Sequence, residues 1–184
     1  MEITAQIPEP KLSRLLFADT KLSWLWAIIR IYVGYEWLMA GYEKFINPAW
    51  IGDQAGTAIT GFFNGAIAKA GGAHPIVSDW YSSFLSNGAL PHATFFSYLI
   101  TYGEILVGIA LILGVFVGIA AFCGAFMNLN FLFAGSVSTN PVLALLGLLL
   151  ILAWRNAGWF GLDRWVLPKL GTPWHKGELF TQKT

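Results

Sequence analysis

The sequence has few of the residues from which redox and metal sites are usually built. It contains one cysteine, Cys123, and three histidines, none of them deep in an apolar segment: His74, His92 and His175. A single cysteine excludes a disulfide within the chain, a CxxC motif and a cysteine-rich metal site. A bundle haem with two histidine ligands is not expected, and zinc or di-iron sites lack their usual ligands. We therefore predict no metal and no haem.

Charge is scarce as well. Charged residues make up 11% of the chain and hydrophobic residues 56%, whereas a typical soluble domain is about 25% charged. The net charge of +1 gives no indication of nucleic-acid binding. Because a soluble chain of 184 residues has no core large enough to hide so much apolar surface, we expect a multi-pass protein of the inner cell membrane surrounded by the lipid bilayer.

Four apolar segments are long enough to cross the bilayer as helices, which takes about 20 residues. They span residues 22–45, 93–113, 116–137 and 141–160. The predicted fold class is therefore all-α, a polytopic four-transmembrane-helix bundle. The expected organisation is an N-terminal segment at 1–21, a membrane domain at 22–161 with an outer loop at 46–92, and a C-terminal tail at 162–184.

Basic residues indicate the orientation of this bundle. They gather before the first apolar segment and after the last, whereas residues 47–92 contain only Lys69. By the positive-inside rule both termini are cytoplasmic and the loop is extracytoplasmic. That loop carries two short helical patterns, at 59–67 and 76–85, and Asn87-Gly88 is expected to end the second. We predict two short amphipathic helices there.

Ionisable residues interrupt the apolar segments. A charge at membrane depth costs at least ~2.5–3.5 kcal/mol on insertion scales, so such residues usually face a partner or a wet cavity. Lys44 lies at the outer end of the first segment. We expect two acids, two arginines and two asparagines of the separate helices to converge in one internal chamber: Glu36, Glu104, Arg30, Arg155, Asn128 and Asn130. The other interpretation is structural, with an Arg30–Glu104 or Arg155–Glu36 ion pair holding the helices together.

Such a chamber suits a small quinone. Its ring can stack on Trp37 or Tyr102, its carbonyls can accept hydrogen bonds from arginine or asparagine, and its tail can leave between helices. Glu36 and Glu104 can relay the protons that quinone reduction consumes. Cys123, within the third apolar segment, is expected to be a small buried apolar residue.

Short motifs in this order resemble a known family. Residues 30–45 have Arg30, then Gly34, then Ala40-Gly41, then Lys44 before an apolar residue. Residues 103–108, followed by Leu113-Gly114, match a second-span motif of the same family, and Asn128, Asn130 and residues 138–141 are similar to one branch of it. The chain thus resembles the DoxX/DoxD membrane proteins, and the DoxD branch in particular, over about residues 22 to 170.

The resemblance implies a four-helix membrane protein and, for the DoxD branch, a subunit of thiosulfate:quinone oxidoreductase. Such an enzyme oxidises thiosulfate to tetrathionate, passes the electrons to quinone and has a second subunit. By this analogy Arg30, Lys44 and Arg155 bind anion or quinone oxygen, and Glu36 and Glu104 transfer protons. Two alternatives stay open: a non-catalytic accessory or assembly subunit of a respiratory complex that binds quinone or lipid, and a small transporter or proton-conducting bundle.

Overall fold

The computed structural model describes residues 9–171, and these residues form helices and turns without any strand. The predicted all-α class is therefore confirmed for the described part of the chain. Residues 1–8 and 172–184, which belong to the predicted terminal segments, lie outside it.

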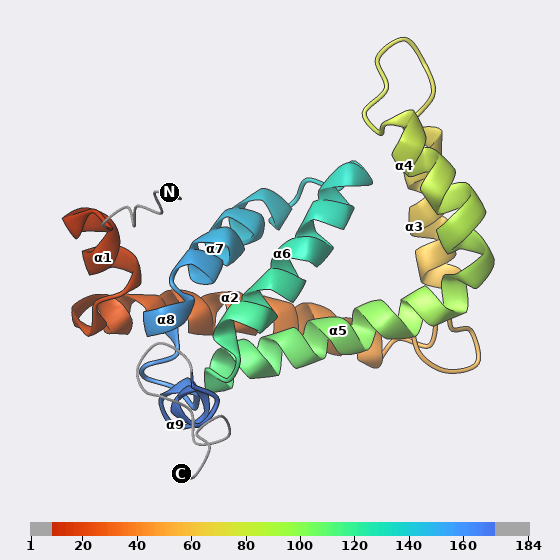
Figure 1. Cartoon of the computed structure of the whole chain (residues 1–184). Helices are drawn as coiled ribbons and strands as arrows, with labels where there is room; N and C mark the ends of the chain where they lie inside the picture. Colours follow the sequence, from red (N-terminus) through yellow and green to blue (C-terminus); the bar gives the residue numbers. More distant parts are fainter. Residues whose placement is uncertain (1–8, 172–184) are drawn as a thin grey trace, which may run out of the picture.

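Two pairs of long helices form the body of the protein. Helix α2 (Ser23–Phe45) lies against α5 (Ala93–Leu113), and α6 (Val117–Phe133) lies against α7 (Asn140–Leu152) (Figure 1). The first two match the predicted segments to within one residue. Helix α6 is shorter than predicted, because Gly135 adopts a positive φ of 68° just beyond it and turns the chain, as glycine commonly does after a helix.

The fourth predicted segment is divided. Helix α7 ends at Leu152, and a separate turn, α8 (Trp154–Ala157), follows. The side chain of Asn156 in α8 donates hydrogen bonds to the carbonyls of Leu16 at 3.1 Å and Asp19 at 2.9 Å. These bonds fix α8 to the N-terminal segment. The remaining short elements are α1 (Lys11–Phe17), η1 (Thr20–Leu22), α3 (Thr57–Ala68), α4 (Asp79–Phe84), η2 (Leu85–Ala89), η3 (Leu90–His92) and α9 (Asp163–Lys169).

The helical path does not end at Asn87-Gly88, so the prediction that this pair ends the second loop helix was wrong. A π-helical turn, η2, and a 3₁₀ turn, η3, carry the backbone from α4 into α5. Leu85 and Ala89 on η2 are each 1% exposed, and their burial outweighs the turn-forming tendency of Asn-Gly. The result is a bend between α4 and α5, so that the α3–α4 pair stands across the N-terminal end of α5 (Figure 1).

Glycines bring the backbones of α2 and α5 into close contact. A Cβ atom on Gly108 would lie 2.6 Å from the backbone nitrogen of Leu38, and one on Gly34 would lie 3.0 Å from the carbonyl oxygen of Gly108. Small residues at such positions allow helices to pack closely in a membrane. The packing also fixes the register of the two helices, and hence which side chains of α2 face α5.

We expect Gly108→Ala to destabilise the protein by about 1–3 kcal/mol, because the added methyl group forces the two backbones apart. Thermal unfolding in one detergent, followed by circular dichroism, measures the change. Gly65→Ala in α3 is the matched control, since its Cβ atom would meet nothing within 4 Å. The control is expected to gain about 0.5–1 kcal/mol from helix propensity. Equal effects of the two substitutions would contradict the close α2–α5 contact.

Two buried clusters of apolar side chains meet near the middle of the molecule. One, which includes Trp37 and Leu111, lies among α2, α5, α6 and α7. The other lies beneath α3 and α4 and includes Phe63 and Tyr81. Phe131 packs against the first cluster, and Phe62 and Ile100 pack against the second. The boundary between the clusters is where the cavities described below are found.

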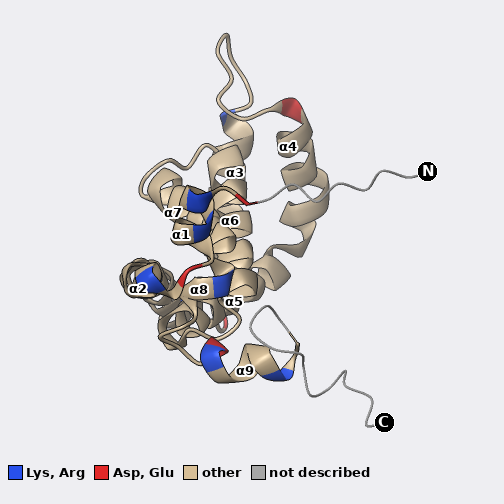
Figure 2. Cartoon of the chain, turned by 60° about the vertical axis from the view of Figure 1, so that its left-hand side comes forward, with Lys and Arg blue, Asp and Glu red and all other residues tan. Residues whose placement is uncertain are grey.

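Within the described residues, one helical run is long and apolar enough to cross a membrane. It is Asp79–Leu113, with 35 residues, and its most apolar stretch of 18 residues has a mean hydropathy of 1.9. Helices α6 and α7 are apolar but have 17 and 13 residues. Charged residues lie on α1, α2, α5, α8 and α9 and near the connection between α3 and α4, whereas α6 and α7 have none (Figure 2). The four-span bundle itself stays a prediction.

Candidate functional site

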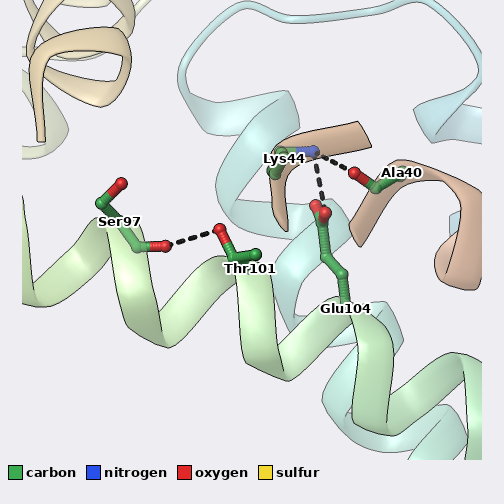
Figure 3. A network of polar contacts seen from close by, with 5 residues as sticks. All are labelled: Ala40, Lys44, Ser97, Thr101 and Glu104. Carbon is green, nitrogen blue, oxygen red and sulfur yellow. Dashed lines mark hydrogen bonds and ion pairs between the residues drawn. The ribbon is translucent and has the colours of Figure 1, made fainter. Parts of the chain in front are cut away.

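An ion pair links the C-terminal end of α2 to the middle of α5. Lys44 Nζ lies 2.8 Å from Glu104 Oε2, and the same ammonium group donates to the Ala40 carbonyl at 3.3 Å (Figure 3). Glu104 is 1% exposed, whereas the side chain of Lys44 is 20% exposed. The carboxylate is therefore enclosed, and its lysine partner is the member of the pair that retains access to the surroundings.

The close packing of α2 and α5 positions this pair. A Cβ atom on Gly41 would lie 3.1 Å from the Cβ of Glu104. Lys44 follows Gly41 by three residues and thus continues the same face of α2. On α5, the Ser97 hydroxyl donates to the Trp50 carbonyl at 2.6 Å. That bond holds the segment after α2 in place, and the Trp50 ring lies with its centroid 5.2 Å from Lys44 Nζ.

Beside the ion pair is a polar cavity of about 320 Å³. Its charged residues are Glu36, Lys44 and Glu104, so two carboxylates and one ammonium group line it. Hydroxyl and amide groups come from the turn between α6 and α7. The lining residues of the polar cavity are Glu36, Trp37, Ala40, Lys44, Trp50, Ile59, Phe62, Ile100, Glu104, Phe131, Ser136, Ser138, Thr139, Asn140 and Leu143.

An apolar groove of about 420 Å³ adjoins the polar cavity. Three residues, Phe62, Ile100 and Phe131, line both spaces and form the partition between them. The other residues of the apolar groove come from α3, α4, η2, α5 and α6: Phe63, Tyr81, Phe84, Leu85, Ala89, Phe96, Leu99, Gly103, Val107, Phe122, Cys123, Phe126, Met127 and Asn130. Together the two spaces offer a polar compartment next to an apolar one.

The few polar groups of the apolar groove are bonded to one another. The Tyr81 hydroxyl donates to the Asn130 carbonyl at 2.9 Å and lies 3.2 Å from Asn130 Oδ1. Asn130 Nδ2 donates to the Phe126 carbonyl at 2.8 Å. The groove therefore presents mainly hydrocarbon and aromatic surface.

The structure brings together four of the nine predicted site residues. Glu36, Trp37, Lys44 and Glu104 line the polar cavity, while Asn130 lines the apolar groove. The other four lie elsewhere: Arg30, Tyr102, Asn128 and Arg155. Asn128 is fully buried on α6, and neither its amide nitrogen nor its amide oxygen has a hydrogen-bond partner among the described residues. The expected single chamber for the two acids, two arginines and two asparagines is therefore wrong.

Arg30 lies at the opposite end of α2 from Lys44. Its guanidinium group donates to the carbonyls of Leu111, Ile112 and Phe160, the latter two at 2.8 and 3.2 Å. The first two are among the terminal carbonyls of α5, which have no partner within the helix. Arg30 thus ties the end of α5 to the chain after α8, and the predicted Arg30–Glu104 pair is replaced by Lys44–Glu104.

Asp163 completes the connection between the end of α5 and the chain after α8. Its carboxylate accepts hydrogen bonds from the backbone N–H groups of Phe116 at 2.6 Å and Val117 at 3.0 Å, at the start of α6. Phe116 has a positive φ of 48°, which is unfavourable for a side chain of its size. Burial raises the pKa of Asp163, and the two N–H donors and the charge of Arg30 oppose that rise. The cluster stabilises the turn between α5 and α6.

Arg155, Tyr102 and Cys123 also lie outside their predicted surroundings. Arg155 is 3.7 Å from Glu9, and its side chain is 44% exposed, so it does not pair with Glu36. Tyr102 is exposed and stacks on Tyr98, away from both cavities. Cys123 was expected to be buried but is exposed. It follows Phe122 on the outward face of α6, where it lines the apolar groove.

Sequence reasoning missed the contribution of three regions. The turn at 136–140 was not among the predicted site residues, although its hydroxyl and amide side chains line the polar cavity together with Lys44. Trp50 was not predicted as a site residue either, although it lines the polar cavity. No sequence signal marks Tyr81, because its contact with Asn130 depends on the bend between α4 and α5.

These features define a membrane-associated α-helical protein with a polar cavity beside an apolar groove. The family model of DoxX matches residues 25–136, and the chain belongs to the DoxX family. The matched region runs from α2 to the end of α6 and includes both partners of the Lys44–Glu104 pair. No curated protein and no solved structure matches the chain. The narrower DoxD assignment stays a prediction.

Proposed function

We propose that the chain is the membrane subunit of a quinone-linked oxidoreductase that acts on a small sulfur anion such as thiosulfate. In this proposal α2, α5, α6 and α7 are the four spans, and both termini are cytoplasmic. The observation that carries the proposal is the contact between the polar cavity and the apolar groove across a shared partition. A quinone has the same division, with a polar ring and a long apolar tail.

The polar cavity suits the head of a quinone. Trp37 and Trp50 offer aromatic surfaces for a flat ring. The partly exposed Lys44 can donate a hydrogen bond to a ring oxygen, and the hydroxyl groups at 136–140 offer further donors. Glu36 and Glu104 are placed to supply protons to a reduced ring. The two carboxylates around one ammonium group favour an uncharged head over a dianion.

The proposed reaction is balanced by two half-reactions. Two thiosulfate ions lose one electron each and join through a new S–S bond as tetrathionate. One quinone takes up the two electrons and two protons and becomes quinol. Because the charge of the polar cavity disfavours a dianion, we assign quinone to this chain and the binding of thiosulfate to its contact with a second subunit.

Binding of a short-tailed ubiquinone analogue to the full chain in nanodiscs tests the quinone assignment. Trp50→Leu removes an aromatic surface of the polar cavity and is expected to weaken binding about two- to tenfold, the effect of losing one aromatic contact of about 0.5–1.5 kcal/mol. Trp80→Leu is the matched control, because Trp80 is exposed on α4 and lines neither space. Absence of saturable binding to the unmodified chain, or equal effects of both substitutions, would overturn the assignment.

A second candidate is an accessory subunit that holds quinone or lipid without turnover. The observation that favours it is the engagement of Lys44 by Glu104 and by the Ala40 carbonyl, an arrangement suited to holding helices together. Thiosulfate-dependent quinone reduction by membranes that contain the chain separates the two. Saturable quinone binding without such turnover supports the accessory role, whereas Glu104-dependent flux into proteoliposomes would indicate a transporter.

A further inference from the structure

We propose that the apolar groove holds the isoprenoid tail of the same quinone whose head occupies the polar cavity, and that the tail enters sideways from the bilayer. This inference rests on the function proposed above. It adds a second subsite, a direction of entry and a preference for long-tailed quinones.

The chemistry of the apolar groove selects an apolar occupant. Its hydroxyl and amide groups, on Tyr81 and Asn130, are already bonded within the protein. A polar head placed there would lose its hydrogen bonds to water without replacing them, which is costly. A hydrocarbon chain loses nothing of this kind and gains by leaving water.

The position of the apolar groove indicates which hydrocarbon chain it holds. Phe62, Ile100 and Phe131 are walls of both spaces, so an occupant of the groove lies directly beside the head in the polar cavity. A single amphipathic molecule can fill both when these three side chains, which lie between the two spaces, move apart. A phospholipid has two acyl chains and a large charged head, whereas a quinone combines one tail with a small uncharged ring, which fits one groove and one cavity.

The far wall of the apolar groove lies at the surface of the protein. Leu99 on α5 and Phe122 and Phe126 on α6 line the groove and are 52%, 60% and 60% exposed. In the proposed four-span arrangement these surfaces face the acyl chains of the bilayer. Between them, Gly103 leaves the groove open, since its Cβ atom would meet only Met127 Sδ, at 3.4 Å. A tail can therefore pass between α5 and α6 beneath α4.

Cys123 provides a reporter for occupancy of the apolar groove. It is the only cysteine in the sequence, and it is an exposed lining residue of the groove. Ubiquinones have a fully substituted ring that does not add thiols, so they do not consume the reporter. The measured quantity is the rate at which N-ethylmaleimide alkylates Cys123 in the full chain in nanodiscs.

We expect a long-tailed ubiquinone to slow this alkylation by about tenfold. A tail-less analogue, in which a methyl group replaces the tail so that the ring stays fully substituted and does not add the thiol, is expected to leave the rate unchanged at concentrations that saturate the head site. Protection by both compounds, or by neither, would overturn the tail assignment. Protection that follows the phospholipid composition of the nanodisc instead of added quinone would overturn it in favour of a lipid. If the tail-less analogue does not bind at all, the proposed function fails, which is a separate result.

Gly103→Leu tests the same idea without the reporter. The added side chain fills the apolar groove, so the affinity for the long-tailed quinone is expected to fall about tenfold, to the level of the tail-less analogue, while binding of the analogue is unchanged. Leu106→Phe, on the same helix but outside both spaces, is the matched control and should alter neither affinity. Loss of affinity for both ligands with Gly103→Leu would contradict a separate tail subsite.

Discussion

Replacing Arg30 by methionine is expected to destabilise the protein by about 3–5 kcal/mol while leaving the quinone affinity of the folded protein unchanged. The guanidinium group of Arg30 is 1% exposed and donates to three main-chain carbonyls, those of Leu111, Ile112 and Phe160. Methionine has similar length but no donor, so these acceptors would stay buried without their partner. Asp163 would lose its nearby positive charge as well.

Denaturant titration in a fixed detergent measures the first part of this prediction, and quinone titration of the folded fraction measures the second. Arg155→Met is the control, because its side chain is 44% exposed and lies 3.7 Å from Glu9. We expect the control to change the stability by no more than about 1 kcal/mol, as is usual for exposed ion pairs. If Arg30→Met lost quinone affinity at unchanged stability, Arg30 would belong to the ligand site after all.

The extent of the long helices could be predicted because the sequence marks them locally. Long apolar runs gave α2 and α5 almost to the residue, although ionisable residues interrupt them. The glycines at 34, 41 and 108 are where the backbones of the two helices approach each other closely. At each of these glycines, the neighbouring group is the other helix of the α2–α5 pair. Local pattern was misleading at Asn87-Gly88, where burial of Leu85 and Ala89 keeps the chain helical.

The partners of the charged residues could not be predicted in the same way. Arg30 donates to main-chain carbonyls. Because every residue has such a carbonyl, the sequence does not indicate which ones bind an arginine. Arg30 and Lys44 were both predicted to bind anion or quinone oxygen, although fourteen positions of helix separate them by about 21 Å. The register of α2 against α5 decides that Glu104 meets Lys44.

The apolar groove depended even more on tertiary structure. Tyr81 reaches Asn130 only because the η2 and η3 turns bend the chain between α4 and α5. The exposure of Cys123 likewise follows from the direction in which α6 presents that face. The sequence predicted a space for a polar head beside an apolar tail. It did not predict that α4, interpreted only as an amphipathic helix of the outer loop, lines the apolar groove.

Substitutions at Lys44 and Glu104 are expected to separate the structural role of the ion pair from its role in binding. Lys44→Met leaves the buried carboxylate of Glu104 without its partner and should destabilise the protein by about 3–5 kcal/mol. Glu104→Gln removes the buried charge and leaves Lys44, which is 20% exposed, able to reach water. We expect a smaller loss for it, of about 1 kcal/mol.

The variant with both substitutions decides between the two roles. Its stability should return to about that of Glu104→Gln alone, because no uncompensated charge is left inside, and the difference from additivity measures the coupling of the pair. Its quinone affinity should nevertheless stay about ten- to a hundredfold weaker than that of the unmodified chain, since a charged donor worth about 1.5–3 kcal/mol is missing. Glu104→Gln alone retains this donor and should bind quinone nearly normally. Full affinity in the restored double variant would show that Lys44 only holds α2 and α5 together, and that the head of the ligand is recognised by other residues of the polar cavity.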